Sequence, residues 1–150
     1  MELTNRVLRN RARPCTFGFP TRNLNLAQEM LDFMREQKGI GLAAPQIGLS
    51  KRIFVMEIEH TERFCFNPEI TESSQNLSDF NEGCLSFKGD CCIITRPAEI
   101  SVRYQNHRGD WYAERLDGLW ARCFQHELDH LDGITMWDRY KEQHAEQSRD

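Results

Sequence analysis

The stretch Gln125-His126-Glu127-Leu128-Asp129-His130 places charged and polar side chains in the middle of an apolar segment. Asp117 is suited to cap a helix and Gly133 to end one, so a helix is expected from Asp117 to about Leu131. The apolar residues at helical spacing along it are Leu119, Trp120, Cys123, Phe124, Leu128 and Leu131. This helix is therefore expected to border the core, with the rest of the fold built around it.

Two histidines of this stretch are placed to share a metal ion. His126 and His130 are four residues apart, so they lie one turn apart on the same helix face. Their ring nitrogens can converge on one ion, and the adjacent Glu127 can reach a water molecule at that ion. Short His/Glu patterns also arise by chance on exposed helices. Next to a core, however, imidazoles without partners are costly, and metal binding is favoured.

A hydrolytic metal site uses about three protein ligands and leaves one position for water. Asp132 is too close in sequence to return to the same ion, and a tail residue has little to hold it rigid. Upstream, Cys84 is the better candidate, because Gly83 beside it allows close backbone approach and thiolates bind borderline-soft metals well. A lone cysteine is nevertheless more often a small core residue than a ligand. The candidates in the tail are Asp138, Glu142, His144 and Glu146.

The remaining pattern predicts an α+β fold: a mostly antiparallel sheet packed around the central metal-binding helix, in one domain of residues 1–150. Apolar spacing predicts a helix over 25–38, ended by Gly39 in a left-handed conformation. The expected strands are 52–58, 64–66, 100–104 and 111–116, with a turn at 106–110, a loop at 71–81, a basic N-terminal arm packed along the domain up to residue 20, and a frayed tail over 141–150.

Composition limits the classes of function. A chain of 150 residues is the usual size of one domain. The net charge of −4 argues against a broad nucleic-acid surface. There is no run of about 18 apolar residues to span a membrane, and the N-terminus does not have the apolar stretch of a signal peptide. A cytoplasmic, reducing location is expected, so the six cysteines are interpreted as thiols or metal ligands rather than disulfides.

The stretch from Gly39 to Gly48, Gly-Ile-Gly-Leu-Ala-Ala-Pro-Gln-Ile-Gly, is expected to form a tight backbone that a ligand can approach closely. Gln46 offers a side-chain amide suited to a developing oxyanion. A phosphate-binding loop is the alternative, but the Lys-Ser/Thr that should follow the glycines is absent.

Taken together, Gly39 to Gln46, Glu82 to Ser86 and Gln125 to His130 resemble the three signature motifs of peptide deformylases. These motifs read G-x-G-L-A-A-x-Q, E-G-C-L-S and Q-H-E-x-D-H, and every fixed position is met in the family's order. The resemblance extends from about Leu8 to Tyr140. The second motif, followed by Phe87 and Gly89, resembles the plant-organelle and cyanobacterial branch of the family.

The resemblance implies a metal-dependent enzyme that hydrolyses the formyl group from N-terminal formylmethionine of nascent polypeptides. Cys84, His126 and His130 would hold the ion, usually ferrous iron (Fe2+) in this family, with zinc, nickel or cobalt (Zn2+, Ni2+ or Co2+) also accommodated. Glu127 would take a proton from water and deliver it to the leaving amine. The catalytic hydrogen-bond donors to the oxyanion would be Gln46 and the backbone N–H of Leu85.

The resemblance also implies how the peptide binds. It would add as a strand beside Ile40 and Gly41. Glu82 would pair with Arg96. The alternative is that this pair is a surface ion pair, which contributes little to stability. Cys91 stands where many bacterial members carry a peptide-contacting arginine. The substrate-binding set carried over is Ile40, Gly41, Phe80, Glu82, Gly83, Leu119, Arg122 and Cys123, of which Ile40, Phe80, Leu119 and Cys123, with the imidazole of His126, would line the methionine pocket.

Like Cys91, two further features depart from the family pattern. Arg122 falls where many members have an apolar pocket residue, so the outer pocket is expected to differ in breadth or polarity. Most bacterial members continue into a long C-terminal helix that docks on the ribosome. Here the sequence ends at Asp150, which predicts weak ribosome association by that route.

Two other functions compete with deformylation. An endopeptidase of the His-Glu-x-x-His type would use nearly the same chemistry at the metal, although a downstream ligand is missing. A non-catalytic metal or redox module would use Cys84, Cys91 and Cys92. Structural zinc sites are usually closed by four protein ligands, however, and such a site would have no need for Glu127.

Overall fold

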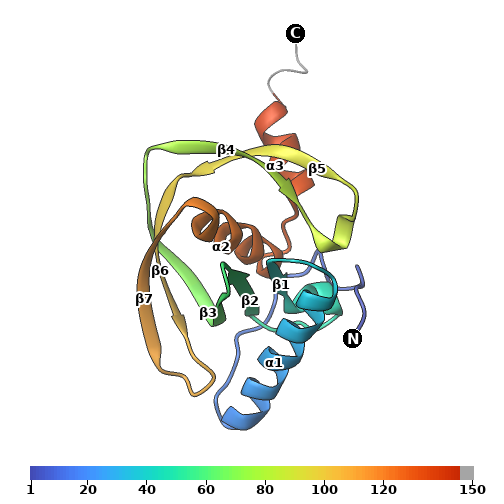
Figure 1. Cartoon of the computed structure of the whole chain (residues 1–150), viewed down its shortest axis with the longest axis vertical. Coiled ribbons are helices and arrows are strands. Elements are labelled where there is room, and N and C mark those ends of the chain that lie inside the picture. Colours follow the sequence, from blue (N-terminus) through green and yellow to red (C-terminus); the bar gives the residue numbers. More distant parts are fainter. Residues whose placement is uncertain (146–150) are drawn as a thin grey trace.

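The computed structural model describes residues 1–145, and it has one helix at its centre (Figure 1). This helix, α2 (Gly118–Leu131), lies between a five-stranded sheet and a two-stranded hairpin. The other helices are α1 (Pro20–Glu36) and α3 (Met136–His144), and short 3-10 turns occupy η1 (Ala44–Ile47) and η2 (Leu85–Phe87). The α+β class expected from the sequence, with an antiparallel sheet around a central helix, is confirmed.

Both sheets are antiparallel. The larger has the strand order β1-β2-β3-β6-β7, and the smaller is the β4-β5 hairpin that crosses over α2 (Figure 1). The strands are β1 (Gly41–Ala43), β2 (Ile53–Ile58), β3 (Thr61–Ser73), β4 (Leu77–Gly83), β5 (Cys91–Pro97), β6 (Glu99–Gln105) and β7 (Trp111–Asp117).

Strand β2 is buried on both faces, which explains its continuous apolar sequence. Ile53 and Val55 pack in the cluster that contains the buried face of α1. Phe54 points to the other side, where its ring meets Phe124 of α2 edge to face, with centroids 4.9 Å apart. Successive side chains of β2 point to opposite faces of the sheet, so this one strand contributes to two separate cores.

Three local expectations are wrong. Helix α1 begins at Pro20 rather than 25, because a proline at the first helical position costs no backbone hydrogen bond. The left-handed residue after it is Lys38 (φ 61°), not Gly39. The stretch 71–81 is not a loop, since β3 extends to Ser73 and β4 begins at Leu77. In β4 only Glu82 is buried, so this strand has no apolar alternation by which the sequence could reveal it.

The expected fraying from Lys141 is also wrong for residues 141–144, which belong to α3. The helix begins with a capping box between Thr135 and Asp138. Near its other end the Gln143 amide bonds both backbone groups of Thr95 in β5, at 2.9 and 2.7 Å. Residues 146–150 of the expected tail lie outside the described residues.

The N-terminal arm packs along the domain, as expected. The Ala12 N–H donates to the Leu131 carbonyl at 2.8 Å, and the Thr4 N–H donates to the Gln46 carbonyl at 2.9 Å. The arm therefore contacts the end of α2 and the glycine-rich stretch together. All six cysteines are free, in agreement with the sequence interpretation. None of the helices in residues 1–145 is both long and apolar enough to cross a membrane.

Gly133→Ala is expected to destabilise the protein more than Gly118→Ala. Both glycines have positive φ, 76° and 51°, where alanine costs about 1–2 kcal/mol. A Cβ at Gly133 would also lie 2.5 Å from the Arg9 carbonyl oxygen, whereas one at Gly118 would meet nothing within 4 Å. Overpacking of this kind adds about 1–3 kcal/mol. Urea denaturation of both variants measures the difference, and equal destabilisation would contradict this packing of the arm.

Candidate metal centre and active site

Three potential ligand atoms converge beside α2. His126 and His130 lie one turn apart on that helix, and Cys84 follows β4 immediately. Their ligand atoms all lie within 4.8 Å of one another, with Cys84 Sγ and His130 Nε2 separated by 3.3 Å. Within residues 1–145 this is the only group of three or more His, Cys, Asp or Glu residues found close enough to hold a metal ion.

Glu82 orients one of the two imidazoles. Its Oε1 accepts a hydrogen bond from His126 Nδ1 at 2.9 Å, which leaves Nε2 for a metal, as in most protein metal sites. Glu82 also pairs with Arg96 through two hydrogen bonds of 2.7 and 3.0 Å. Burial raises the pKa of Glu82, but these hydrogen bonds and the charge of Arg96 hold it well below its usual range. The pair is confirmed, and it is buried rather than on the surface.

The two histidines have opposite tendencies to ionise. Burial lowers the pKa of both, and for His130 it falls well below the ordinary value. For His126, hydrogen bonds to Cys84 and Glu82 outweigh burial and raise the pKa to about 10. A metal ligand must be the neutral imidazole, so metal binding at His126 would compete with protonation of its ring.

Glu127 carries a buried carboxyl group directly beside these residues. Burial raises its pKa to about 7, opposed by the nearby His126. In residues 1–145 only Glu127 Oε1 and His130 Nδ1 are buried side-chain atoms that have no hydrogen-bond partner. Gly41 of β1 lies against the same carboxyl, and a Cβ there would be 2.5 Å from Glu127 Oε2. A carboxyl with its pKa near neutrality and an unused oxygen is suited to proton transfer.

Gln46 is held with its amide N–H2 toward Cys84. Its Oε1 accepts from the Ala43 N–H at 2.9 Å, while Nε2 lies 3.0 Å from Ser86 Oγ and 3.5 Å from Cys84 Sγ. Leu85 begins η2 next to Cys84 and packs so closely on Gly39 that a Cβ there would be 2.6 Å from its Cδ1. The glycine-rich stretch and the cysteine loop therefore meet at the site.

A cavity of about 340 Å³ opens beside the cluster. His130 is fully buried and does not line it, and neither does Cys91. Burial and the charge of Glu127 raise the pKa of the Cys123 thiol well above its ordinary value, so this wall stays uncharged. Every residue expected to bind substrate lines the cavity: Ile40, Gly41, Phe80, Glu82, Gly83, Leu119, Arg122 and Cys123.

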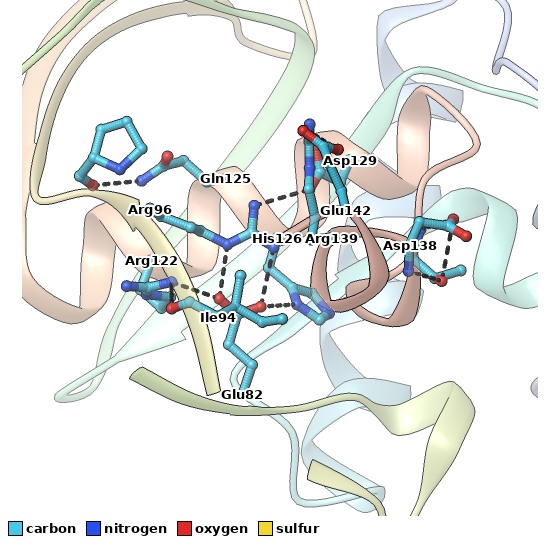
Figure 2. A network of polar contacts seen from close by, with 12 residues as sticks. Glu82, Ile94, Arg96, Arg122, Gln125, His126, Asp129, Asp138, Arg139 and Glu142 are labelled. Carbon is cyan, nitrogen blue, oxygen red and sulfur yellow. Dashed lines mark hydrogen bonds and ion pairs between the residues drawn. The ribbon is translucent and has the colours of Figure 1, made fainter. Parts of the chain in front are cut away.

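The resemblance predicted the Glu82–Arg96 pair, but sequence reasoning missed the rest of the charged network behind the site (Figure 2). The guanidinium of Arg122 donates to Glu82 Oε2 at 2.7 Å, to the Ile94 carbonyl at 3.0 Å and to the Ser78 carbonyl at 2.7 Å. Arg96 reaches Asp129 as well as Glu82. A buried Asp on an apolar helix was a signal that arginine partners must exist, because unpaired buried charges are strongly unfavourable.

Comparison with known proteins identifies the family. The polypeptide deformylase family model matches residues 1–146. The chain belongs to the polypeptide deformylase family. The peptide deformylase of Thermotoga neapolitana is 44% identical over 135 residues, which cover 90% of this chain and 82% of that protein.

Solved deformylase structures share the whole fold. That of Thermotoga maritima superposes with a TM-score of 0.86 at 44% identity, over 89% of this chain and 90% of that one. Arabidopsis thaliana peptide deformylase 1B, solved in complex with an inhibitor, has a TM-score of 0.88 at 34% identity, over 99% and 86%. Peptide deformylases are metal-dependent hydrolases that remove the N-formyl group from nascent peptides, so the chain is such an enzyme rather than an endopeptidase or a non-catalytic metal module.

Glu82→Ala is expected to destabilise the metal-free deformylase by about 3–5 kcal/mol, because it leaves two buried arginines without their shared carboxylate. Glu69→Ala is the matched control, since Glu69 pairs with Arg103 where both side chains are 49% exposed, and it should have little effect. Chemical denaturation of the two variants makes the comparison. A similar loss of unfolding free energy in both variants would contradict the prediction, because it would mean that the Glu82 network is exposed to solvent.

Proposed function

We propose that Cys84, His126 and His130 bind one divalent metal ion, and that the adjacent cavity receives the formylmethionine end of a nascent polypeptide. The observation that carries this proposal is the convergence of the three ligand atoms within 4.8 Å beside the buried Glu127 carboxyl. Three protein ligands are the number that leaves a position open for catalysis. His126 Nδ1 is already bonded to Glu82, which orients the ring and leaves Nε2 for a metal.

One thiolate and two imidazoles suit several borderline metals. Ferrous iron is the ion we propose, and zinc, nickel and cobalt fit the same donors. When bound, the ion would supply Lewis acidity, lowering the pKa of water and polarising the formyl carbonyl.

Glu127 is the proposed general base and acid. Its carboxylate takes one proton from the attacking water, whose oxygen adds to the formyl carbon. Glu127 delivers its proton to the methionine nitrogen as the carbon–nitrogen bond breaks, and formic acid leaves and loses its remaining proton to solvent as formate. Burial supports both steps, because a pKa of about 7 lets the group accept and release a proton near neutral pH.

Gln46 and Leu85 are the proposed donors to the oxyanion. The Gln46 carbonyl oxygen is held by the Ala43 N–H, and its N–H2 faces Ser86 Oγ and Cys84 Sγ, from which one N–H would turn to the oxyanion. The backbone N–H of Leu85 is the second proposed donor, next to Cys84 in sequence. Pre-oriented donors of this kind stabilise charge that develops only in the transition state.

The cavity suits a methionine side chain. Its walls include apolar groups of Ile40, Phe80, Leu119 and Cys123, and an unbranched thioether fits such a lining. Strand β1 is at one edge of the sheet, so the peptide backbone can add to it beside Ile40 and Gly41. Glu82 and Arg122 line the same cavity, yet their charged groups bond to each other. We therefore propose that they shape the cavity wall rather than pair with charges on the substrate.

The substrate implies where the enzyme works. Formylated nascent chains emerge from ribosomes, so we propose that it acts in the cytoplasm. Weak ribosome association stays a prediction.

Glu127→Gln is expected to keep the metal and to lower kcat/KM for formyl-Met-Ala-Ser by about 10²–10⁴-fold, the range for removal of a general base. Glu72→Gln makes the same chemical change at an exposed position and should leave activity unaltered. Activity is measured on anaerobically prepared protein with ferrous iron or nickel. Loss of metal by Glu127→Gln would contradict the assignment of Glu127 as a base rather than a ligand.

Gly41→Ala is expected to reduce kcat at least tenfold with metal content unchanged, because the new methyl group would displace the Glu127 carboxyl and 1 Å of misplacement can cost about 10²-fold. Gly18→Ala, where a Cβ meets nothing within 4 Å, is the control. Steady-state kinetics and metal analysis of both variants check this. An unchanged kcat in Gly41→Ala would show that the Glu127 position tolerates movement.

A further inference from the structure

Helix α3 is joined to α2 by a bidentate ion pair. Arg139 of α3 donates from Nε to Asp129 Oδ2 at 3.0 Å and from Nη2 to Asp129 Oδ1 at 2.9 Å. Asp129 lies in α2 between the two histidines and is only 7% exposed. Paired hydrogen bonds between a guanidinium and a carboxylate fix the plane of both groups.

The contact continues inward to His126. Arg96 Nη1 donates to the same Asp129 oxygen, Oδ2, at 2.8 Å, and the other side of the Arg96 guanidinium bonds both oxygens of Glu82. Glu82 Oε1 then bonds His126 Nδ1. Figure 2 shows the series, which runs Arg139, Asp129, Arg96, Glu82, His126 with alternating charge up to the imidazole.

Each member of this series leaves its neighbour little freedom. Asp129 has both oxygens bonded to Arg139, so it presents Oδ2 to Arg96 at a fixed angle. Without Arg139, the carboxylate could rotate about its last side-chain bond, and Arg96 would follow it. Glu82 takes two hydrogen bonds from Arg96, so its orientation toward His126 would loosen in turn.

We propose that Arg139 is a positioning residue for the metal centre, acting through Asp129, Arg96 and Glu82 on the ring of His126. Helix α3 is then an outer support of the site. This inference rests on the proposed role of His126 as a metal ligand. Partners one contact beyond the ligands change metal affinity or activity by about 10–100-fold, and a more distant member is expected at the lower end of that range.

The second attachment of α3 provides a matched control. Gln143 lies one turn beyond Arg139 and bonds the Thr95 backbone of β5 at 2.9 and 2.7 Å. It anchors the same helix, but its hydrogen bonds go to Thr95, which is not a member of the charged series. A loss that came only from loosening α3 would therefore appear in Gln143→Ala as well.

The test uses the cobalt-loaded enzyme and three variants: Arg139→Met, Arg139→Lys and Gln143→Ala. The readouts are the rate of cobalt release to a chelator, the visible cobalt absorption bands, and kcat and KM for formyl-Met-Ala-Ser. Arg139→Met should release cobalt about tenfold faster, shift the bands and lower kcat with little change in KM. Arg139→Lys should be intermediate, because an ammonium keeps the charge but cannot fix the carboxylate plane. Gln143→Ala should lower Tm and leave cobalt release and the bands as in wild type.

Two outcomes overturn the proposal: wild-type cobalt release and spectrum in Arg139→Met, or the same changes in Gln143→Ala. Should Arg139→Met not fold, Arg139→Lys against Gln143→Ala decides the question with the same readouts. Failure of the wild-type enzyme to bind one cobalt per chain would instead contradict the ligand assignment itself, so the two failures are distinguishable.

Discussion

The buried carboxylate of Glu82 is the point on which the site depends. It accepts hydrogen bonds from His126, Arg96 and Arg122, and it is 4% exposed. A charge so deeply buried is tolerated only when its partners are complete and well oriented. Because those partners come from α2 and β5 while Glu82 lies near the end of β4, satisfying one carboxylate fixes the hairpin against the helix. The same contact places Cys84, two residues later, beside the histidines.

This arrangement explains why α2 is so unusual a core helix. It buries Gln125, His126, Glu127 and Asp129 together with Phe124 and Leu131. One side packs through Phe124 against β2, and the other meets the polar network under the hairpin. The apolar side supplies the burial that drives the helix into the centre, and the network compensates for the charges carried there. Stability and chemistry therefore use different faces of a single element.

Enclosure also sets the chemistry of Glu127. Its neighbour Gly41 allows the β1 backbone to approach the carboxyl closely, and burial raises its pKa to about 7. An exposed glutamate would be ionised throughout the physiological range and would be a poor proton donor. The group lies under edge strand β1, so the proposed general base is next to the edge where we propose that the peptide adds. The cavity, the carboxyl and the three proposed metal ligands thus lie within one small region of the fold.

What the sequence determined by itself was local and chemical. The spacing of His126 and His130 predicted that both lie on one helix face, and the apolar run over 52–58 predicted a strand. The glycine, cysteine and histidine motifs identified the family and the residues that meet in the cavity. Only the tertiary structure decided the rest. Strand β4 is almost entirely exposed, so it has no pattern to detect, and α3 packs on β5 through only Met136, Trp137 and Tyr140, too few apolar residues to predict a helix. The partners of Asp129 and Arg122 come from residues distant in sequence, and charge pairing has no periodicity. Which arginine meets which carboxylate is settled only when the chain has folded and every buried charge must find a partner.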